Sequence, residues 1–318
     1  MTKYYIENFV IAAIISLVLG PIIIPELKKL KIGQAIREDG PQSHLIKTGT
    51  PTMGGIIFIV STLITILVFG VNDKEAILCT FSMLAFGLIG LIDDYLIVVK
   101  KTNDGLSASQ KFSAQVLVAL VLMFLSTKIN ELGNLYIPFL GRETVNLGIF
   151  YYPVTLFVIL GTVNSVNLTD GLDGLAASVS MVGLVGFAVI NVILSKNYLS
   201  MFAMALAGSL LGYLRYNKFP AQVFMGDVGS LALGGAFAAI AVVSGTTLYL
   251  PIIGLIFVVE TLSVIIQVAS FKLRGKRVFL MSPIHHNYEA KGWSEVKIVK
   301  VFFAITLITT VISILAIR

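Results

Sequence analysis

The sequence predicts an all-α fold: a polytopic membrane helical bundle of about ten transmembrane helices with both termini outside. Three observations support this prediction, namely the composition, the length of the apolar segments and the distribution of lysine and arginine between them. Hydrophobic residues make up 57% of the 318 residues, charged residues only 13%, and the mean hydropathy is +0.93. Because soluble domains usually carry about 25% charged residues, this composition indicates a chain whose solvent is lipid.

Ten apolar segments are each close to the roughly 20 residues that a helix needs to cross a bilayer. No repeat of 20–50 residues is visible among them, and no linker of biased composition separates them. We therefore expect a single integral membrane domain over residues 1–318. The expected spans are residues 6–25, 54–70, 76–98, 111–128, 150–166, 174–194, 198–214, 228–247, 250–271 and 297–317.

The loops between these spans differ in charge. With ten spans the connections alternate between two sides, and the loops after the odd-numbered spans hold 17 of the 23 lysine and arginine residues. Positive residues concentrate in the cytoplasmic loops of membrane proteins, so we place these loops in the cytoplasm and both termini outside. Topology thus accounts for the net charge of +6, and we expect no nucleic-acid partner. A single cysteine, Cys79, excludes a disulfide framework.

Acidic and amide side chains collect at the cytoplasmic ends of the predicted spans. Asp93 and Asp94 end the third span. Asn167, Asp170 and Asp173 follow one another at a spacing of three, so that a continued helical turn would stack them on one side. Ionisable groups at membrane depth are costly unless they are paired or face water. Their clustering on one side therefore predicts a functional site at the cytoplasmic face.

Two further acids lie at the start and in the middle of later spans. Asp227 opens the eighth span within the sequence FMGDVGS. It is either a helix N-cap or, with the carboxylates at the same depth, a ligand of Mg²⁺, which takes one or two protein carboxylates and leaves sites for phosphate oxygens. Glu260 lies in the middle of the ninth span, where we expect it to be buried and paired within the bundle.

Basic and histidine residues surround this predicted site. Lys47 lies in a glycine- and threonine-rich loop, and is either a phosphate-binding cation or an ordinary residue of a cytoplasmic loop. His285 and His286 lie behind a basic loop without the further ligands of a zinc site, so they are either a chance pair or hydrogen-bond partners of phosphate or sugar. Carboxylates, Mg²⁺ and cations at a membrane surface favour a phosphotransferase with a lipid substrate.

At these motifs the sequence resembles a known family. IDDY, NSVNLTDGLDGLA, FMGDVGSLALGG and PIHH are similar to signatures of the polyprenyl-phosphate N-acetylhexosamine-1-phosphate transferase superfamily. Within it, GPQSHLIKTGTPTMGG, ETLSVIIQV and GKRVFLMSPIHHNYEAKGWSE resemble the phospho-N-acetylmuramoyl-pentapeptide transferases (MraY type). The resemblance is collinear from about Gly40 to Glu295. It implies ten spans and an active site on the cytoplasmic side of a bacterial inner membrane.

The resemblance also implies a reaction and its partners. A Mg²⁺-dependent transferase of this family moves phospho-MurNAc-pentapeptide from UDP-MurNAc-pentapeptide to undecaprenyl phosphate, giving lipid I and UMP in peptidoglycan biosynthesis. The expected partners are these two substrates and the lipid bilayer. A homodimer is compatible with the sequence.

By motif position, the resemblance implies roles for single residues. Asp227 would bind Mg²⁺, and one of the essential acids Asp93 and Asp94 would deprotonate the lipid phosphate or attack directly. Catalytic residues on this basis are Asp93, Asp94, Asp227 and His286. Residues expected to contact the nucleotide, the sugar or the phosphates are Lys47, Lys101, Asn167, Asp170, Asp173, Phe224 (near the uracil) and His285.

Two positions depart from the family pattern. Asn287 stands where relatives usually have a third histidine. Because asparagine does not titrate near neutral pH, no general acid is expected there. Ile97 stands where relatives commonly have lysine, so phosphate binding would fall more on Lys100, Lys101 and Lys111.

Two other functions compete with this one. A sister enzyme would transfer GlcNAc-1-phosphate, and the segments GTPTMGG and GWSE count against it. A transporter or flippase would carry charges near the bilayer midplane and have pseudo-symmetric halves, whereas here the acids gather at one interface. The sequence leaves open whether transfer takes one step or passes through an aspartyl intermediate, and which of Asp93 and Asp94 acts.

Overall fold

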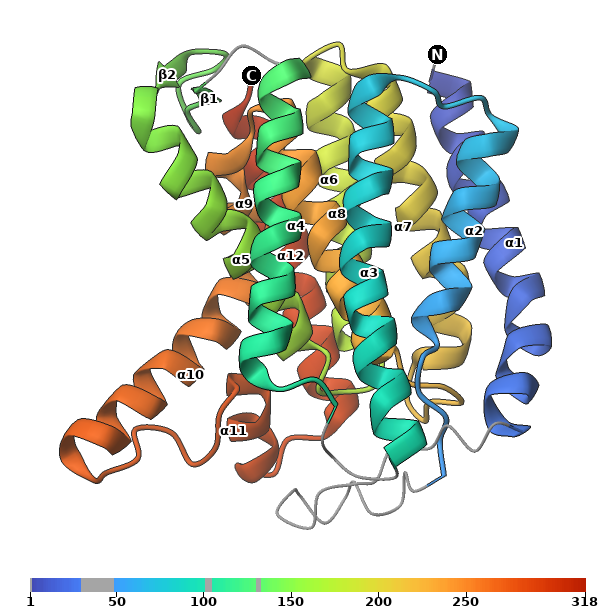
Figure 1. Ribbon diagram of the computed structural model, residues 1–318, viewed down its shortest axis with the longest axis vertical. Helices are drawn as coiled ribbons and strands as arrows, with labels where there is room; N and C mark the ends of the chain where they lie inside the picture. Colours follow the sequence, from blue (N-terminus) through green and yellow to red (C-terminus); the bar gives the residue numbers. More distant parts are fainter. Residues whose placement is uncertain (1, 30–48, 101–104, 130–132) are drawn as a thin grey trace.

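The structure, a computed structural model, describes residues 2–29, 49–100, 105–129 and 133–318. In these ranges nine helices are long and apolar enough to cross a membrane, and the shorter apolar helix α2 accompanies them. The predicted polytopic bundle is therefore confirmed, and α1 begins at the same end of it where α12 ends (Figure 1). The helices are α1 (Thr2–Lys29), α2 (Gly55–Val68), α3 (Lys74–Lys100), α4 (Ala108–Ile129), α5 (Tyr151–Thr169), α6 (Leu175–Ile193), α7 (Asn197–Asn217), α8 (Gly226–Ser244), α10 (Leu255–Arg274) and α12 (Glu295–Ala316).

Short elements connect the long helices. Strands β1 (Asn134–Tyr136) and β2 (Thr144–Asn146) form an antiparallel pair with Leu135 opposite Val145. This pair is the one departure from the all-α prediction within the described residues, and it lies at the end of the bundle away from α11 (Figure 1). The remaining short elements are η2 (Gly148–Phe150), η3 (Thr247–Tyr249), α9 (Leu250–Ile253) and α11 (Ile284–Ala290).

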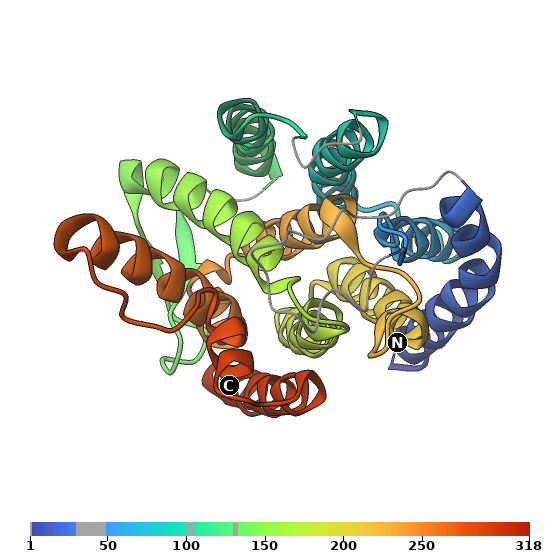
Figure 2. The same cartoon turned by 90° about the horizontal axis from the view of Figure 1, so that it is seen from below.

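Helix α8 lies in the interior of the bundle, packed against α2, α3, α4, α5, α6 and α7 (Figure 2). Every residue from Val228 to Ser244 is buried. Glycine on α8 lets neighbouring helices approach closely, because a Cβ at Gly234 would lie 2.6 Å from the Cα of Val163 and one at Gly235 would lie 2.5 Å from the ring of Phe86. Small residues at such contacts are typical of helix packing in membranes.

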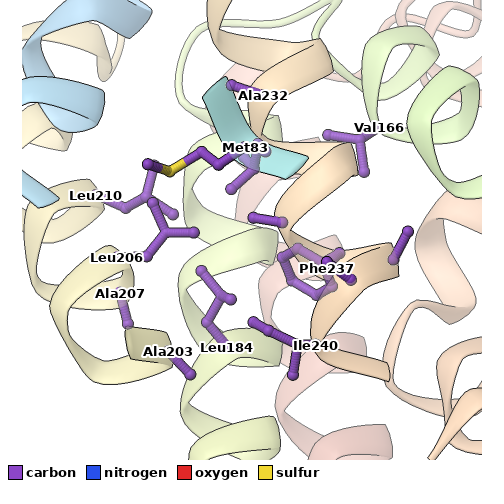
Figure 3. Packing of buried hydrophobic residues seen from close by; sticks show 14 of the residues in the cluster. Met83, Val166, Leu184, Ala203, Leu206, Ala207, Leu210, Ala232, Phe237 and Ile240 are labelled. Carbon is purple, nitrogen blue, oxygen red and sulfur yellow. The ribbon is translucent and has the colours of Figure 1, made fainter. Parts of the chain in front are cut away.

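The core fixes the position of α8 along the bundle. Side chains from α3, α5, α6, α7 and α8 meet there, among them the fully buried Met83 and Leu184 (Figure 3). Phe237 of α8 contacts Phe187 and Phe257 edge-on, with ring centroids 5.9 and 5.6 Å apart. Edge-to-face pairs of this kind add to the stability gained from burial alone. The first turn of α8, which carries Asp227, is therefore held by a well-packed helix.

The ninth predicted span, residues 250–271, differs from the structure. The chain breaks at Gly254 (φ −92°, ψ 29°) into the short helix α9 and the longer α10. A Cβ at this position would lie 2.9 Å from the carbonyl oxygen of Leu250, so the close turn favours glycine. Beyond the break α10 runs obliquely away from the bundle (Figure 1) and exposes Ile265, Phe271 and Leu273.

Candidate active site

Three carboxylates lie near one another where α3 ends and α8 begins. Asp93 and Asp94 lie near the end of α3, and Asp227 lies in the first turn of α8. The two helices touch at Gly90, where any Cβ would overlap the backbone carbonyl of Asp227. Since Gly90 precedes the acid pair by one helical turn, this close contact places the α3 acids beside the start of α8.

Asp227 joins three helices. Its Oδ2 forms an ion pair with Nζ of Lys111 from α4, and its Oδ1 accepts a hydrogen bond of 2.8 Å from Nδ2 of Asn167 in α5. Asn167 also donates to Oγ of Ser230, 2.8 Å away. Asp227 is not an N-cap, because the cap position of α8 is Met225. Its side chain keeps 24% of its surface exposed, so a ligand can reach it.

The adjacent acids Asp93 and Asp94 face different partners. Oδ1 of Asp93 accepts from the backbone N–H of Leu106 at 2.8 Å, and its Oδ2 lies 3.4 Å from Nζ of Lys111. Oδ2 of Asp94 accepts from the backbone N–H of Val228 at 3.1 Å. This bond satisfies a free N–H group in the first turn of α8. Asp93 thus pairs with Lys111 beside Asp227, while Asp94 holds the helix that carries Asp227. We call Asp93, Asp94, Asp227 and the nearby Asp170 the acidic cluster.

The predicted stacking of Asn167, Asp170 and Asp173 on one helical face is wrong beyond its first member. Helix α5 ends at Thr169, and the chain turns through a glycine-rich segment to Gly174, whose φ of +77° suits glycine. Oδ2 of Asp173 accepts from the backbone N–H of Ala221 at 2.9 Å, and its own N–H donates to the carboxylate of Glu295. Asp173 therefore ties the turn to the segment before α8 and to α12.

Asp170 lies electrostatically within the acidic cluster. Burial raises the pKa of the Asp170 carboxyl well above its usual range, and the nearby carboxylates of Asp227, Asp94 and Asp173 raise it further. A cation bound in the cluster would oppose this rise. The charge distribution here therefore favours a positively charged ligand.

His285 is buried against the carboxylate of Glu260. A buried and paired Glu260 was expected, whereas His285 was expected to contact the substrate. Nδ1 of His285 lies 3.0 Å from Oε1 of Glu260, and both side chains are 0% exposed. A Cβ at Gly171 would overlap the imidazole ring, so the ring packs directly on the turn between Asp170 and Asp173. The expectation that Glu260 is buried and paired is confirmed.

The next two residues of α11 have local partners. Nδ1 of His286 lies 2.6 Å from Oε2 of Glu289 one turn later, and the His286 ring is partly exposed. Asn287 is buried, and its Oδ1 accepts from the backbone N–H of Leu280 at 3.1 Å. The amide at the position that departs from the family pattern thus holds the loop before α11.

The segment before α2 lies against the start of α8. The backbone N–H of Phe224 donates to the carbonyl of Pro51, and the N–H of Gly54 donates to the carbonyl of Phe224, each at 2.8 Å. Phe224 is partly exposed at this junction. Two sequence-predicted residues, Lys47 and Lys101, lie outside the described residues.

Lys111 is the residue whose importance the sequence understated. It was expected only to share phosphate binding, yet it contacts both Asp227 and Asp93. One signal was present in the sequence: Gln115 follows it by one helical turn in a mostly apolar span, so both polar groups share one face.

The acidic cluster is compatible with Mg²⁺ and not with an all-protein metal cage. Among the described residues, no three histidine, cysteine, aspartate or glutamate side chains converge as ligands. Mg²⁺ commonly binds through one or two carboxylates and completes its shell with phosphate oxygens and water. The partly exposed carboxylate of Asp227, with further acids around it, meets that requirement.

Comparison with known proteins identifies the family of the chain. A family model described as glycosyl transferase family 4 matches residues 76–245, which run from α3 to α8. The phospho-N-acetylmuramoyl-pentapeptide-transferase of Clostridium botulinum is 52% identical over 303 residues, covering 95% of this chain and 93% of the relative. The protein of that name from Staphylococcus carnosus is 48% identical (95% and 96% covered), and that from Thermoanaerobacter sp. is 49% identical (98% of each covered). The chain therefore belongs to glycosyl transferase family 4 and, within it, to the phospho-N-acetylmuramoyl-pentapeptide transferases.

Proposed function

We propose that the protein transfers phospho-MurNAc-pentapeptide from UDP-MurNAc-pentapeptide to undecaprenyl phosphate, giving lipid I and UMP in peptidoglycan synthesis. The names of relatives about 50% identical over nearly the whole chain support this reaction. The structural observation that carries the proposal is the meeting of Lys111 and Asn167 at the Asp227 carboxylate, beside Asp93. Phosphoryl transfer depends mainly on positioning and on neutralising oxygen charge, and this cluster offers both.

In the proposed reaction an oxygen of the lipid phosphate bonds to the β-phosphorus of the nucleotide sugar. The bond from that phosphorus to the oxygen bridging the α-phosphate breaks, and the bridging oxygen leaves with UMP. Lys111 would neutralise phosphate oxygens. We assign Asp93 to the lipid phosphate and its proton, because Asp93 faces Lys111. Asp94 is bonded to the α8 backbone, so we assign it to positioning Asp227.

The proposed cofactor is Mg²⁺, and Asp227 is the proposed ligand. When bound, the ion would stabilise negative charge on the transferring phosphate. Asn167 donates to Oδ1 of Asp227 without adding a charge, so it would fix the orientation of the carboxylate while leaving it anionic. Asp170 would add negative potential that attracts the cation.

The remaining sequence-predicted residues divide into two groups. Phe224 and His286 are partly exposed, and for them we keep the proposed contacts with the nucleotide and the sugar phosphate. His285 and Asp173 are buried against other protein groups, so we assign them to positioning the turn beside Asp170. Lys47 and Lys101 stay proposed phosphate contacts. We also propose that this end of the bundle faces the cytoplasm in a bacterial cytoplasmic membrane, supported by the positive loops.

The direct test is UMP release by the purified protein in detergent. UDP-MurNAc-pentapeptide is supplied with undecaprenyl phosphate and Mg²⁺, and each is omitted in turn. We expect release only when all three are present. Release from UDP-GlcNAc and not from UDP-MurNAc-pentapeptide would transfer the protein to the sister enzymes, and no release from either donor by folded protein would refute the proposal.

A pair of matched variants tests the metal site. We expect Asp227→Asn to lower turnover by roughly 100-fold or more, because it removes the proposed anionic ligand. The control is Asp73→Asn, an equivalent change at the start of α3 at the opposite end of the bundle, where Oδ2 of Asp73 accepts from the N–H of Glu75. Equal losses in both variants would contradict a special role for Asp227.

A further inference from the structure

Only one face of helix α4 is buried in the protein, as a single stripe of residues. Its buried residues are Gln115, Ala119, Leu122 and Ser126, spaced as one helical face. Lys111 precedes Gln115 by four residues, so it continues this stripe towards the acidic cluster. Most other residues of α4 are exposed at the bundle surface. The position of Lys111 therefore depends on how this one stripe is anchored.

The anchor next to Lys111 is a polar contact between α4 and α5. Oε1 of Gln115 accepts a hydrogen bond of 2.8 Å from Nδ2 of Asn164. Gln115 is 1% exposed, and its Nε2 has no hydrogen-bond partner among the described residues, so the side chain is held through Oε1. No other side-chain hydrogen bond joins α4 to α5 in the part of the chain that the structure describes.

This contact closes a ring of interactions around the site. Asn164 precedes Asn167 by three residues on α5, and Asn167 donates to Asp227. Lys111 reaches the other oxygen of the same carboxylate from α4. The two helices are thus joined at Asp227 and again one turn away, at the pair formed by Gln115 and Asn164. Together the two joins constrain the rotation of α4 and its distance from α5.

We propose that Gln115 and Asn164 are positioning residues that hold Lys111 against Asp227 and Asp93. A lysine side chain is flexible, and only four residues of α4 are buried against the bundle. Asn164 Nδ2 also donates to the carbonyl of Leu160, but Gln115 is 1% exposed and would lose its one hydrogen bond among the described residues if the pair broke, so the pair favours one arrangement of the two helices. The proposal deepens the proposed function, because its effect on turnover rests on Lys111 acting on the phosphates.

The test removes each half of the pair and then both. Gln115→Met keeps an unbranched side chain of similar length without the acceptor, and Asn164→Leu removes the donor. We expect each to lower kcat roughly 10- to 100-fold, the usual range for groups that orient a directly acting residue, with a smaller change in KM for the nucleotide sugar. The double variant should be no worse than either single one, because both changes break the same contact.

A second readout does not depend on activity. The rate at which Lys111 is acetylated by an amine-reactive reagent is measured by mass spectrometry on the folded protein in detergent. We expect both single variants to raise this rate several-fold, because Lys111 is then released from its ion pairs. The control is Leu122→Ala on the same stripe, which weakens α4 packing but leaves the amide pair intact and should not raise the rate.

The outcomes separate the two proposals. The positioning role is overturned if the losses in kcat of the two single variants multiply in the double variant. It is also overturned if Leu122→Ala raises the reactivity of Lys111 equally, because ordinary packing of α4 then explains the effect. If reactivity changes as expected while wild-type protein releases no UMP from either donor, the positioning role holds and the proposed function fails.

Discussion

Asp170 lies within electrostatic reach of three other carboxylates, those of Asp227, Asp94 and Asp173. Its pKa is raised by burial and by three neighbouring carboxylates, so in the absence of a cation its charged form is disfavoured. A bound cation would favour the charged form again, so the site attracts a cation. Function and stability are therefore in conflict at this residue, as is common where charges gather for chemistry.

For metal-free protein we expect Asp170 to make stability fall as pH rises. The folded state binds the Asp170 proton more tightly than the unfolded chain, whose aspartate pKa is about 3.9. The loss of stability therefore begins above that value and grows until pH passes the raised folded pKa. Asp170→Asn should raise the Tm in EDTA at neutral pH and have little effect near pH 4. Parallel Tm curves for the variant and the wild type would contradict this expectation.

The buried pair of Glu260 and His285 leads to a prediction about stability. Glu260→Leu leaves the fully buried His285 without its carboxylate, and an unpaired buried polar group costs about 1–3 kcal/mol. We expect a clear fall in Tm, with a smaller fall for Glu260→Gln, which keeps a polar partner. Thermal unfolding in detergent measures both. A larger loss in Glu260→Gln would show that the contact is not what holds His285.

At the scale of helices, the contact of α3 with α8 sets the geometry of the acids. Gly90 touches the α8 backbone directly, and the acids follow one turn later on the same face. Gly55 of α2 makes a similar approach to Gly229 of α8. Glycines at these places let α2 and α3 approach the first turns of α8 closely. This close approach sets the distances between the acids of α3 and Asp227 of α8.

Gly90→Ala should therefore impair the enzyme without removing any polar group. The added methyl group would overlap the Asp227 carbonyl, and overpacking of this kind costs about 1–3 kcal/mol. We expect turnover to fall more than roughly 10-fold and the Tm to fall. The control is Gly161→Ala in α5, where nothing lies within 4 Å of the added Cβ. That variant should keep its activity, and a loss as great as that of Gly90→Ala would contradict the argument.

Hydropathy and helix spacing were enough to predict the spans, because lipid leaves the backbone few alternatives to a helix. The break at Gly254 and the end of α5 at Thr169 were not predicted. Both depend on packing against neighbouring helices, and the hydropathy of one apolar segment contains no information about that packing. The same reason explains the site: acids could be placed at one end, but the pairing of Lys111 with Asp227 required the packing of α4.

At the scale of the whole molecule, the two ends of the bundle differ in chemistry. The end of α3, the start of α4 and α11 lie at one end, and the β1–β2 pair lies at the other (Figure 1). Asp93, Asp94 and Lys111 belong to the first of these ends. The distribution of lysine and arginine predicts that the first of these ends faces the cytoplasm. Sidedness is a property of the protein in its membrane, so it needs an experiment in membranes.

Thiol labelling can test the sidedness. Cys79 is fully buried, so the wild-type background should be low. Ser109→Cys at the start of α4 and Thr144→Cys in β2 introduce exposed thiols at opposite ends. A membrane-impermeant maleimide should label Thr144→Cys in spheroplasts and Ser109→Cys in inverted vesicles. The opposite pattern would reverse the proposed orientation.

The enclosure of α8 has a consequence for how the chain is made. Its main packing partners among the long helices, α2 to α7, precede it in the sequence, and α10 adds the later contact of Phe257 with Phe237. Because the ribosome makes the chain from its N-terminus, α8 is synthesised after the helices α2 to α7 that surround it. Asp227 is thus the last of the cluster to arrive, and until it does Lys111 and Asn167 have no common partner. In this order of synthesis the contacts of Lys111 and Asn167 with Asp227 can form only after the glycine- and alanine-rich α8 has been made and has entered the bundle.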